Sequence, residues 1–508
     1  MLNHSNVTRS IQTQTHQMAV TNQMKNQHLL WRAGFGSAAE NLKDLSSVTP
    51  QKVYAALTKT SNVRPQYFDV ADNALKGLFM GIGDAVKMEE MRKNGLDGET
   101  RKKIRQQSRE DLKNLNLTWL NEMVNTDAQL REKMSLFWHG HFACRDINIF
   151  FQQLLLDEIR TNSLGNFGDL LKAVSKSASM LGFLNNQQNK KQHPNENFAR
   201  EVMELFTLGR GNYTEHDIKE AARAFTGWSF NLKGEFVYRR FQHDNGKKTI
   251  LGKTGNFDGD DVLNILLEQK QTSKYITRKL YKFFVNENII DESKVTWLAD
   301  RFYQSNYNIT ALMQDIFMSD WFYDEKNMGS NIKSPIELLV GIRRLLPMEI
   351  ESEQLQLLFQ RALGQVLFYP PNVAGWPGGK NWIDSSSLML RLRIPQLIKD
   401  DNTFEINVKS DDDQQMGMKE NYKNKTQAAM GKTGFQVRAN VDWEKYAKQF
   451  DGVPRENLYD VIEAVVLQTK PGSVNEQAVK QMIDSSTREN YIKTATVALM
   501  STPEYQLC

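Results

Sequence analysis

The sequence predicts a mainly α-helical protein, a multi-helix globular array with a minor β-hairpin and a small strand-bearing insertion. Apolar residues recur at intervals of three and four along most of the 508 residues, which is typical of helices with one buried face. The 26 Phe, 15 Tyr and 9 Trp residues supply a large core, so the chain is not disordered as a whole. No run of 18 or more apolar residues is present, so we expect no transmembrane helix.

Composition excludes several classes of function. The net charge is only +4, and the basic residues are spread along the chain, so we expect no nucleic-acid binding. Cys144 and Cys508 are the two cysteines, too few for a disulfide framework or a thiolate metal cluster. Residues 1–26 are polar and lack the apolar stretch of a secretory signal peptide. We therefore expect a flexible N-terminal segment and a cytoplasmic protein, with export left open.

Three helices are predicted in the part of the chain that holds the first two polar motifs. Apolar spacing predicts helical structure over 111–142 and again over 149–159. The segment 197–208 is amphipathic, and Gly209 follows its last apolar residue. Because glycine tolerates the left-handed backbone of a helix C-terminus, we expect the third helix to end there.

Two further helices have recognisable first turns. Thr214 is followed three residues later by Asp217, and Ser334 is followed three residues later by Glu337. Both pairs fit the reciprocal capping box, in which each side chain accepts a bond from the other residue's backbone N–H. Pro335 directly follows Ser334, and proline favours the first helical position.

Strands are a minor component. Alternating apolar residues predict a hairpin at 228–241 and a second strand pair inside 400–442. The polar stretch 410–434 inside that insertion is expected to be a mobile loop. The domain organisation is thus a main helical domain at 27–399, the insertion, and C-terminal helices at 443–508 that pack on the main domain.

His139-Gly140-His141 is the first candidate site. On a regular helix, residues i and i+2 point about 200° apart, but a break at Gly140 would place both histidines on one face. Converging imidazoles suit Zn, Mn or Fe, so His139 and His141 are predicted metal ligands. The alternative is a helix-end histidine bonded to a free carbonyl, with the other one exposed.

The helix predicted over 197–208 supplies the second candidate. At 100° per residue, Glu196, Arg200, Glu201 and Glu204 share one face. Such a cluster binds a metal or acts as acid and base when it lines a cleft. We expect this face to look inward toward the histidines. The alternative is a solvated face with a weak Glu196–Arg200 pair.

Two other motifs complete the candidates. His243 and Asp244 stand beside a tight Asn-Gly turn, so they act as ligands or as a base and its orienter if the turn aims both inward. The segment 369–379 holds three Pro, three Gly and Trp376, which is typical of a rigid loop. Such a loop forms a pocket wall for a flat ligand, or it seals helix ends.

Taken jointly, these motifs resemble a large bacterial family known as domain of unknown function 1800. The resemblance covers the chain from about residue 28 to its end. The matching segments are 28–36, 133–142, 195–209, 213–215, 222–228, His243-Asp244 with Lys248, 370–379 and 501–505. The family carries no established activity, and the resemblance implies a sulfatase-like protein as a partner.

Two functional hypotheses follow. The first is a metal-dependent hydrolase with a divalent ion. Its metal ligands are predicted as His139, His141 and Glu204, its catalytic residues as Glu201, His243 and Asp244, and its substrate-binding residues as Arg200 and Trp376. The second is a non-enzymatic binding or assembly protein that acts with the sulfatase-like partner. Whether the protein is an enzyme is left open by the sequence.

Overall fold

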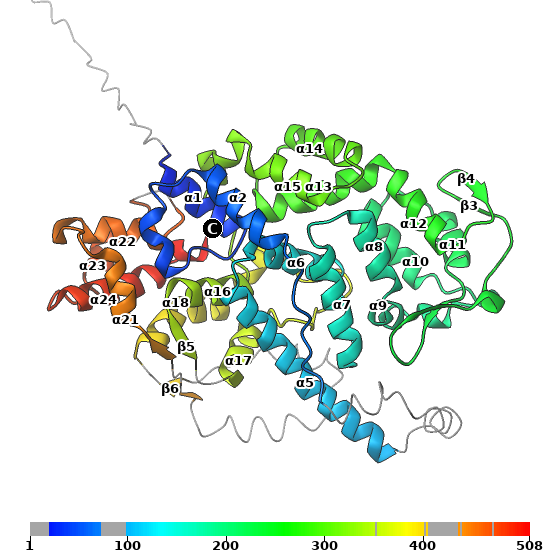
Figure 1. Ribbon diagram of the computed structural model, residues 1–508, viewed down its shortest axis with the longest axis horizontal. Coiled ribbons are helices and arrows are strands. Elements are labelled where there is room, and N and C mark those ends of the chain that lie inside the picture. The colour runs from blue at the N-terminus through cyan, green and yellow to red at the C-terminus, as the bar shows by residue number, and fades with distance from the viewer. Residues whose placement is uncertain are drawn as a thin grey trace, which may run out of the picture.

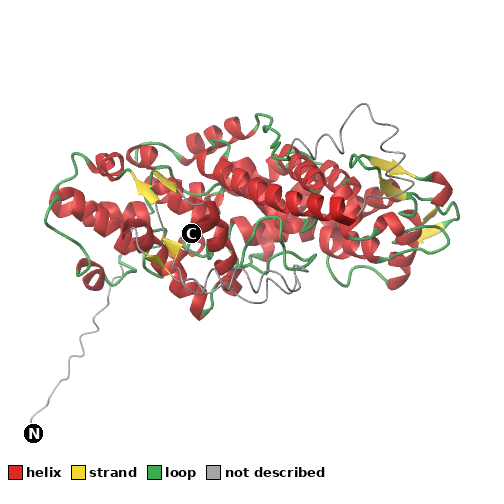
Figure 2. Ribbon diagram, turned by 90° about the horizontal axis from the view of Figure 1, so that it is seen from below, coloured by secondary structure: helices red, strands yellow, loops and turns green. Residues whose placement is uncertain are grey.

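The computed structural model describes residues 20–72, 98–350, 353–400, 403–404, 435–436, 439–469 and 472–508. These residues form an elongated array of helices (Figure 1). The strands are short antiparallel pairs that lie mostly toward the two ends of the array (Figure 2). The mainly α-helical prediction is therefore confirmed.

The helices of the described residues range from 5 residues in α10 to 28 residues in α5, and turns and short 3₁₀-helices join them. They are α1 (Asn22–Arg32), α2 (Pro50–Ser61), α5 (Gly98–Asn125), α6 (Gln129–His141), α7 (Ile149–Asn162), α8 (Phe167–Lys176), α9 (Ala178–Phe183), α10 (Asn197–Glu201), the π-helix η3 (Val202–Leu208), α11 (Glu215–Ala224), α12 (Gly259–Glu268), α13 (Lys270–Phe284), α14 (Glu292–Gln304), α15 (Ile309–Phe317), α16 (Pro335–Leu345), α17 (Glu353–Leu363), α18 (Ser385–Asp400), α21 (Trp443–Ala447), α22 (Leu458–Val466), α23 (Glu476–Lys480) and α24 (Arg488–Met500).

The described strands pair in two-stranded sheets, β1 with β2, β3 with β4, β5 with β8 and β6 with β7. They are β1 (Trp228–Phe230), β2 (Phe236–Tyr238), β3 (Lys248–Ile250), β4 (Lys253–Gly255), β5 (Met348–Ile350), β6 (Thr403–Phe404), β7 (Phe435–Gln436) and β8 (Ala439–Val441).

The strand predictions are mostly correct. β1 and β2 form the expected hairpin, with Trp228 opposite Tyr238. The second strand pair places Phe404 opposite Phe435, as predicted inside 400–442. Val441, although inside 400–442, lies opposite Met348 of β5 and not in the second pair. The loop predicted at 410–434 lies outside the described residues.

Hydrophobic packing divides the array into three neighbouring clusters. The largest cluster unites α6 to α15 in the middle and at the right-hand end of Figure 1. The second unites α16 to α18 with α21, α22 and α24 at the left-hand end. The third surrounds the inner half of α5. Helices from both sides of the 400–442 insertion thus share one core.

Helix α6 lies where these clusters meet and packs against α2, α5 and α7. All but one of its thirteen residues are buried, including the charged Arg131, Glu132 and Lys133. Because a buried charge is costly unless it is paired, each of these three side chains has an oppositely charged partner.

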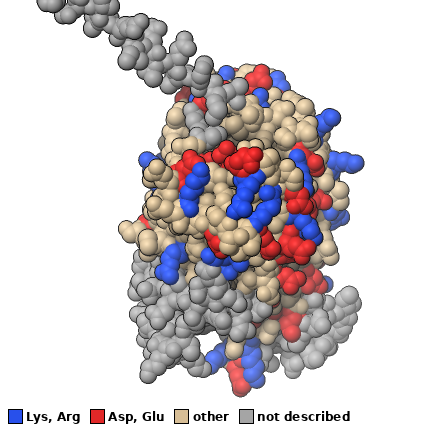
Figure 3. Space-filling view, turned by 90° about the vertical axis from the view of Figure 1, so that its left-hand side faces the viewer, with Lys and Arg blue, Asp and Glu red and all other residues tan. Residues whose placement is uncertain are grey.

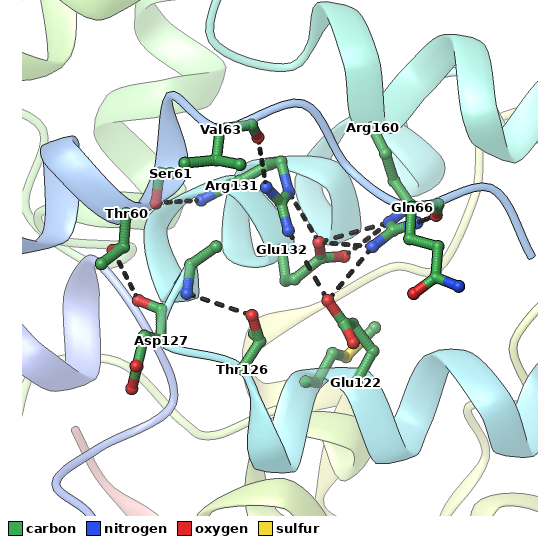
Figure 4. Close-up of polar contacts among 12 residues, drawn as sticks. Thr60, Ser61, Val63, Gln66, Glu122, Thr126, Asp127, Arg131, Glu132 and Arg160 are labelled. Atoms are coloured by element: carbon green, nitrogen blue, oxygen red, sulfur yellow. Dashed lines mark hydrogen bonds and ion pairs between the residues drawn. The ribbon is translucent and has the colours of Figure 1, made fainter.

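Glu132 is the centre of the most extensive of these pairings (Figure 4). Its carboxylate is fully buried and accepts from Arg131 Nε at 2.9 Å, from Arg160 Nη2 at 2.9 Å and from Trp119 Nε1 at 2.8 Å. Glu122, at 3.6 and 3.4 Å from the two guanidinium groups, supplies the second negative charge. The network fixes α5, α6 and α7 to one another.

Both predicted capping boxes are present. Thr214 and Asp217 cap α11, and Ser334 and Glu337 cap α16 with Pro335 in its first turn. The helix predicted over 197–208 consists of two parts, α10 and the π-helix η3, and it ends at Gly209 with φ of 77°. In the described part of the chain, no helix is long and apolar enough to cross a lipid bilayer.

Candidate functional site

The break expected at Gly140 is absent. Helix α6 continues through His141, and the N–H of Phe142 still donates to the carbonyl oxygen of Trp138 at 2.8 Å. His139 and His141 are therefore two positions apart on an unbroken helix and point in different directions. The prediction that they share one face is wrong, because a glycine with room around it does not by itself end a helix.

His139 is a core residue. It is 3% exposed, and its Nε2 atom accepts from the N–H of Phe368 at 3.1 Å. The rings of Trp119, Phe368 and Trp376 surround it, with centroids 5.1 to 5.6 Å away. Burial in this aromatic shell lowers the pKa of His139 to about 3, so the imidazole stays neutral at ordinary pH.

His141 is fixed by two bonds. Its Nε2 atom lies 3.2 Å from the carbonyl oxygen of Phe206, and its Nδ1 atom lies 2.8 Å from Lys279 Nζ. A carbonyl only accepts hydrogen bonds, so the proton is on Nε2 and Nδ1 accepts from the lysine. Burial, assisted by the Lys279 charge, lowers the pKa of His141 well below its ordinary value.

The bond to Phe206 joins two of the sequence motifs. The π-helix η3 leaves carbonyl groups near its end without the usual helical partners, and side chains from outside supply donors. Tyr275 Oη donates to Leu205 at 3.2 Å, and Gln271 donates to Leu208 at 3.0 Å. The 195–209 motif is thus anchored to α6 and α13 through its backbone.

The carboxylate face of the 195–209 motif lies at the surface. Arg200 forms two 2.8 Å bonds with Glu215 and a 3.3 Å bond with Glu196. Glu201 is half-buried, and desolvation raises its pKa. These contacts are those of a solvent-facing ion-pair cluster.

Glu204 is also engaged. It accepts from Tyr213 Oη and, at 2.9 Å, from Arg210 Nε. The bond from Tyr213 is the main reason that the pKa of Glu204 is lowered. Glu204 has no contact with His139 or His243 in the described part of the chain.

His243 and Asp244 come shortly before β3 in the chain, and β3 and β4 lie at the right-hand end of the array in Figure 1. The Nδ1 atom of His243 lies 3.0 Å from the carbonyl oxygen of Thr226. Asp244 accepts from Arg223 Nε at 2.7 Å, and this guanidinium lowers the pKa of its carboxyl group. Both residues thus join the 222–228 motif to the turn after the first hairpin.

Among the residues that the structure describes, no group of three or more His, Cys, Asp or Glu side chains is arranged to hold a metal ion. The predicted metal set of His139, His141 and Glu204 is not brought together as one group. Arg200, Glu201 and Glu204 lie at the surface. His243 and Asp244 contact Thr226 and Arg223 and not these residues.

A cavity of about 470 Å³ is lined by part of the candidate set. It is bounded by α1, α6, α13, the start of α16 and the loop 374–382. His141 and Trp376 line it directly, and His139 lies behind the Trp376 ring. The charged and aromatic side chains of the lining are those of Arg32, Phe137, His141, Lys279, Lys282, Phe283, Glu287, Glu337, Trp376, Lys380 and Trp382.

The Trp376 loop depends on glycine. Gly378 has φ of 71° and ψ of 178°, a backbone region that essentially only glycine occupies, and Gly379 has a positive φ of 57°. A Cβ atom on Gly379 would lie 3.0 Å from Glu287 Oε2. The loop thus lies close to Glu287 and forms part of the cavity wall. A pocket wall is one of the two roles that the sequence suggests for this motif.

Positive charge dominates the cavity lining. Arg32, Lys279, Lys282 and Lys380 line it together with Glu287 and Glu337. Glu337 is already paired with the buried Lys133. The sequence does not single out these cations, because lysines on a helix resemble a solvated face. Arg32 is the exception, since it lies within the 28–36 motif and could have been predicted as a site residue.

Four of these groups have shifted pKa values, and Lys279 and Glu287 are among them. Burial, assisted by the charge of Lys282, lowers the pKa of Lys279 to about 8. Burial raises the pKa of Glu287, although the N–H of Ile332 bonds to its carboxylate at 2.8 Å. A cavity with shifted titratable groups is the usual candidate for a functional site.

A family model for a protein of unknown function, DUF1800, matches residues 28–507. No curated protein and no solved structure matches the chain. The matched region includes the end of α1, the two-histidine helix α6 and the Trp376 loop, which line the cavity, and the 195–209 motif, which contacts His141 through the carbonyl oxygen of Phe206. Since the match spans nearly the whole length, the chain belongs to the DUF1800 family.

Proposed function

We propose that the protein binds a small organic anion in the cavity between α6, α13 and the Trp376 loop. The observation that carries the proposal is the lining itself, in which four cations face two carboxylates and one of those carboxylates is already paired. The volume of about 470 Å³ is within the range of small-molecule sites.

Arg32 supports an anionic ligand. Its side chain is 1% exposed, and its Nη2 atom donates to the carbonyl of Asn327 at 3.0 Å and to Ser330 Oγ at 2.8 Å. Both of these acceptors are neutral groups, so they do not cancel the charge of the guanidinium. Because Arg32 lines the cavity, its positive charge suits a carboxylate or phosphate ester.

The aromatic side chains suggest the rest of the ligand. Phe137, Phe283, Trp376 and Trp382 line the same cavity as the cations. Aromatic rings stack on flat apolar groups. A ring or another planar group that carries one acidic substituent therefore matches both parts of the lining.

Calorimetry with aromatic carboxylates and aromatic phosphate esters tests this proposal, with their uncharged amides as matched controls. Saturable one-site binding of the acids alone is expected. Lys282→Met and Trp376→Ala should each weaken binding about tenfold, or ~1.4 kcal/mol. Lys274→Met alters an exposed lysine on the same helix and should leave affinity unchanged. The proposal would be wrong if the amides bound as tightly as the acids, or if every variant bound the acids as tightly as the wild type.

Metal-dependent hydrolysis is a second candidate. One observation favours it, namely that His141 lies on the wall of a cavity able to hold a substrate. The test is elemental analysis of protein purified without a metal-affinity tag, repeated on a variant with His139→Ala and His141→Ala. Stoichiometric metal that the double variant loses would support this candidate.

Two expectations about partners remain proposals. The resemblance implies a sulfatase-like protein, and co-purification of the two full-length proteins would test it. The absence of nucleic-acid binding is supported by the small net charge and by the mixture of acidic and basic side chains on the face in Figure 3. A gel-shift titration with double-stranded DNA and with single-stranded RNA tests that expectation.

A further inference from the structure

We propose that Lys279 is a nucleophilic amine that condenses with a carbonyl group of the anionic ligand and forms an imine in the cavity. The inference rests on the proposed function, because the cavity must first hold such a ligand. It adds the ligand's chemical class, an acid that also bears an aldehyde or ketone, and a covalent step.

The position of Lys279 is the first argument. The side chain comes from α13, is partly buried and lines the cavity. Its Nζ atom donates to His141 Nδ1 at 2.8 Å. His141 cannot turn its protonated nitrogen toward the lysine, because Nε2–H is held by the carbonyl of Phe206 at 3.2 Å. The imidazole therefore acts as a fixed acceptor for one N–H of the amine.

The free valences of the amine are the second argument. A neutral primary amine has two hydrogens and one lone pair besides its carbon. One hydrogen is engaged by His141, and no other hydrogen-bond partner of Nζ is present among the described residues. The lone pair is thus free for a carbon electrophile, whereas Lys133 in the same region is held by Glu337 and by the carbonyl of Trp31 at 3.0 Å.

Protonation is the third argument, because only the neutral amine is a nucleophile. The neighbouring Lys282 and the apolar surroundings disfavour the ammonium form, and they lower the pKa of Lys279 to about 8. A free lysine has a pKa of ~10.4, so at neutral pH Lys279 holds about a hundred times more neutral amine than a free lysine does.

The step balances without a further reagent. The nitrogen lone pair adds to the carbonyl carbon while the C=O π electrons move to oxygen, which gives a carbinolamine. The two amine hydrogens then leave with that oxygen as water, and the C=N bond forms. No oxidant or reductant takes part, and water reverses the reaction. Arg32 and Lys282 would hold the acidic group of the same ligand.

The experiment uses the full chain at neutral pH with 4-carboxybenzaldehyde, an aromatic acid with an aldehyde, and sodium cyanoborohydride to reduce any imine. Peptide mapping by mass spectrometry locates the adducts. We expect Lys279 to be labelled at least about tenfold faster than Lys274, an exposed lysine of the same helix, since its neutral fraction is larger. Labelling of both at the same rate would overturn the inference.

Variants and a matched ligand separate the possible failures. Lys279→Arg should remove the fast label, and Lys274→Arg should not change it. The comparison within the wild-type chain keeps the test decisive even if Lys279→Arg does not fold. The alcohol 4-(hydroxymethyl)benzoate shares the ring and acid but has no carbonyl group, so it should bind reversibly and protect Lys279. Binding of the alcohol without preferential labelling would overturn the imine alone, whereas no binding and no labelling would overturn the proposed function as well.

Discussion

The backbone of Gly375 lies directly against the carbonyl oxygen of Gly140, and a Cβ atom on Gly375 would overlap that oxygen. Gly375 belongs to the Trp376 loop and Gly140 stands between the two histidines of α6. The φ of Gly375 is 81°, so both the backbone conformation and the close approach require glycine. This contact holds the loop on the helix and forms one side of the cavity.

Gly375→Ala should therefore destabilise the protein by about 2 kcal/mol or more, because backbone strain and a clash with backbone add together. Gly452→Ala is the matched control. Gly452 has a nearly equal φ of 82° but nothing within 4 Å of its Cβ position, so its cost should be only about 1–2 kcal/mol. Chemical denaturation measures both, and equal losses would contradict the role of the Gly140 contact.

Glu132→Gln should lower the free energy of unfolding by about 3–5 kcal/mol. The substitution leaves Arg131 and Arg160 buried with only the partly exposed Glu122 to balance them. Glu110→Gln removes the partner of Lys113 in an exposed pair and should change stability by less than about 1 kcal/mol. Urea denaturation of both variants checks the difference.

Stability should depend on pH through Lys279. Its pKa is about 8 in the folded protein and ~10.4 in the unfolded chain. Between these values the unfolded state binds more protons, so the free energy of unfolding rises with pH. Below pH 8 the full penalty of burying the charge is present.

Lys279→Met removes that penalty, so the variant should gain most, relative to wild type, at pH 7 and lose this advantage as pH rises toward 10. Thermal denaturation at several pH values measures the difference. The stability of the Lys274→Met variant should change with pH in the same way as that of the wild type. A gap between wild type and Lys279→Met that is constant with pH would refute the assignment.

Asp244→Asn should affect stability and leave binding in the cavity unchanged. The substitution weakens the bonds at 2.7 and 3.3 Å between Arg223 and Asp244, which are worth about 1–3 kcal/mol as charge-assisted hydrogen bonds. Calorimetric titration with an aromatic acid, beside denaturation, separates the two effects. Weaker ligand binding by a stably folded variant would restore Asp244 as a site residue.

Sequence by itself determined the features whose physics is local. The capping boxes at Thr214 and Ser334 need only residues three positions apart. The hairpin from Trp228 to Tyr238 needs alternation and a turn. These interactions form within one turn of helix or one strand pair. They can therefore be predicted correctly without knowledge of the rest of the chain.

Tertiary structure alone decided what the polar residues do. The partners of His141 and His139 are 65 and 229 residues away along the chain, and α6 stays helical through Gly140 because it is packed on several sides. Lys279 and Arg32 line one cavity, and burial there lowers the pKa of both side chains. Spacing along the chain describes which residues share a face of one helix, but the charge and reactivity of a side chain depend on the dielectric and the neighbours that other elements bring to it.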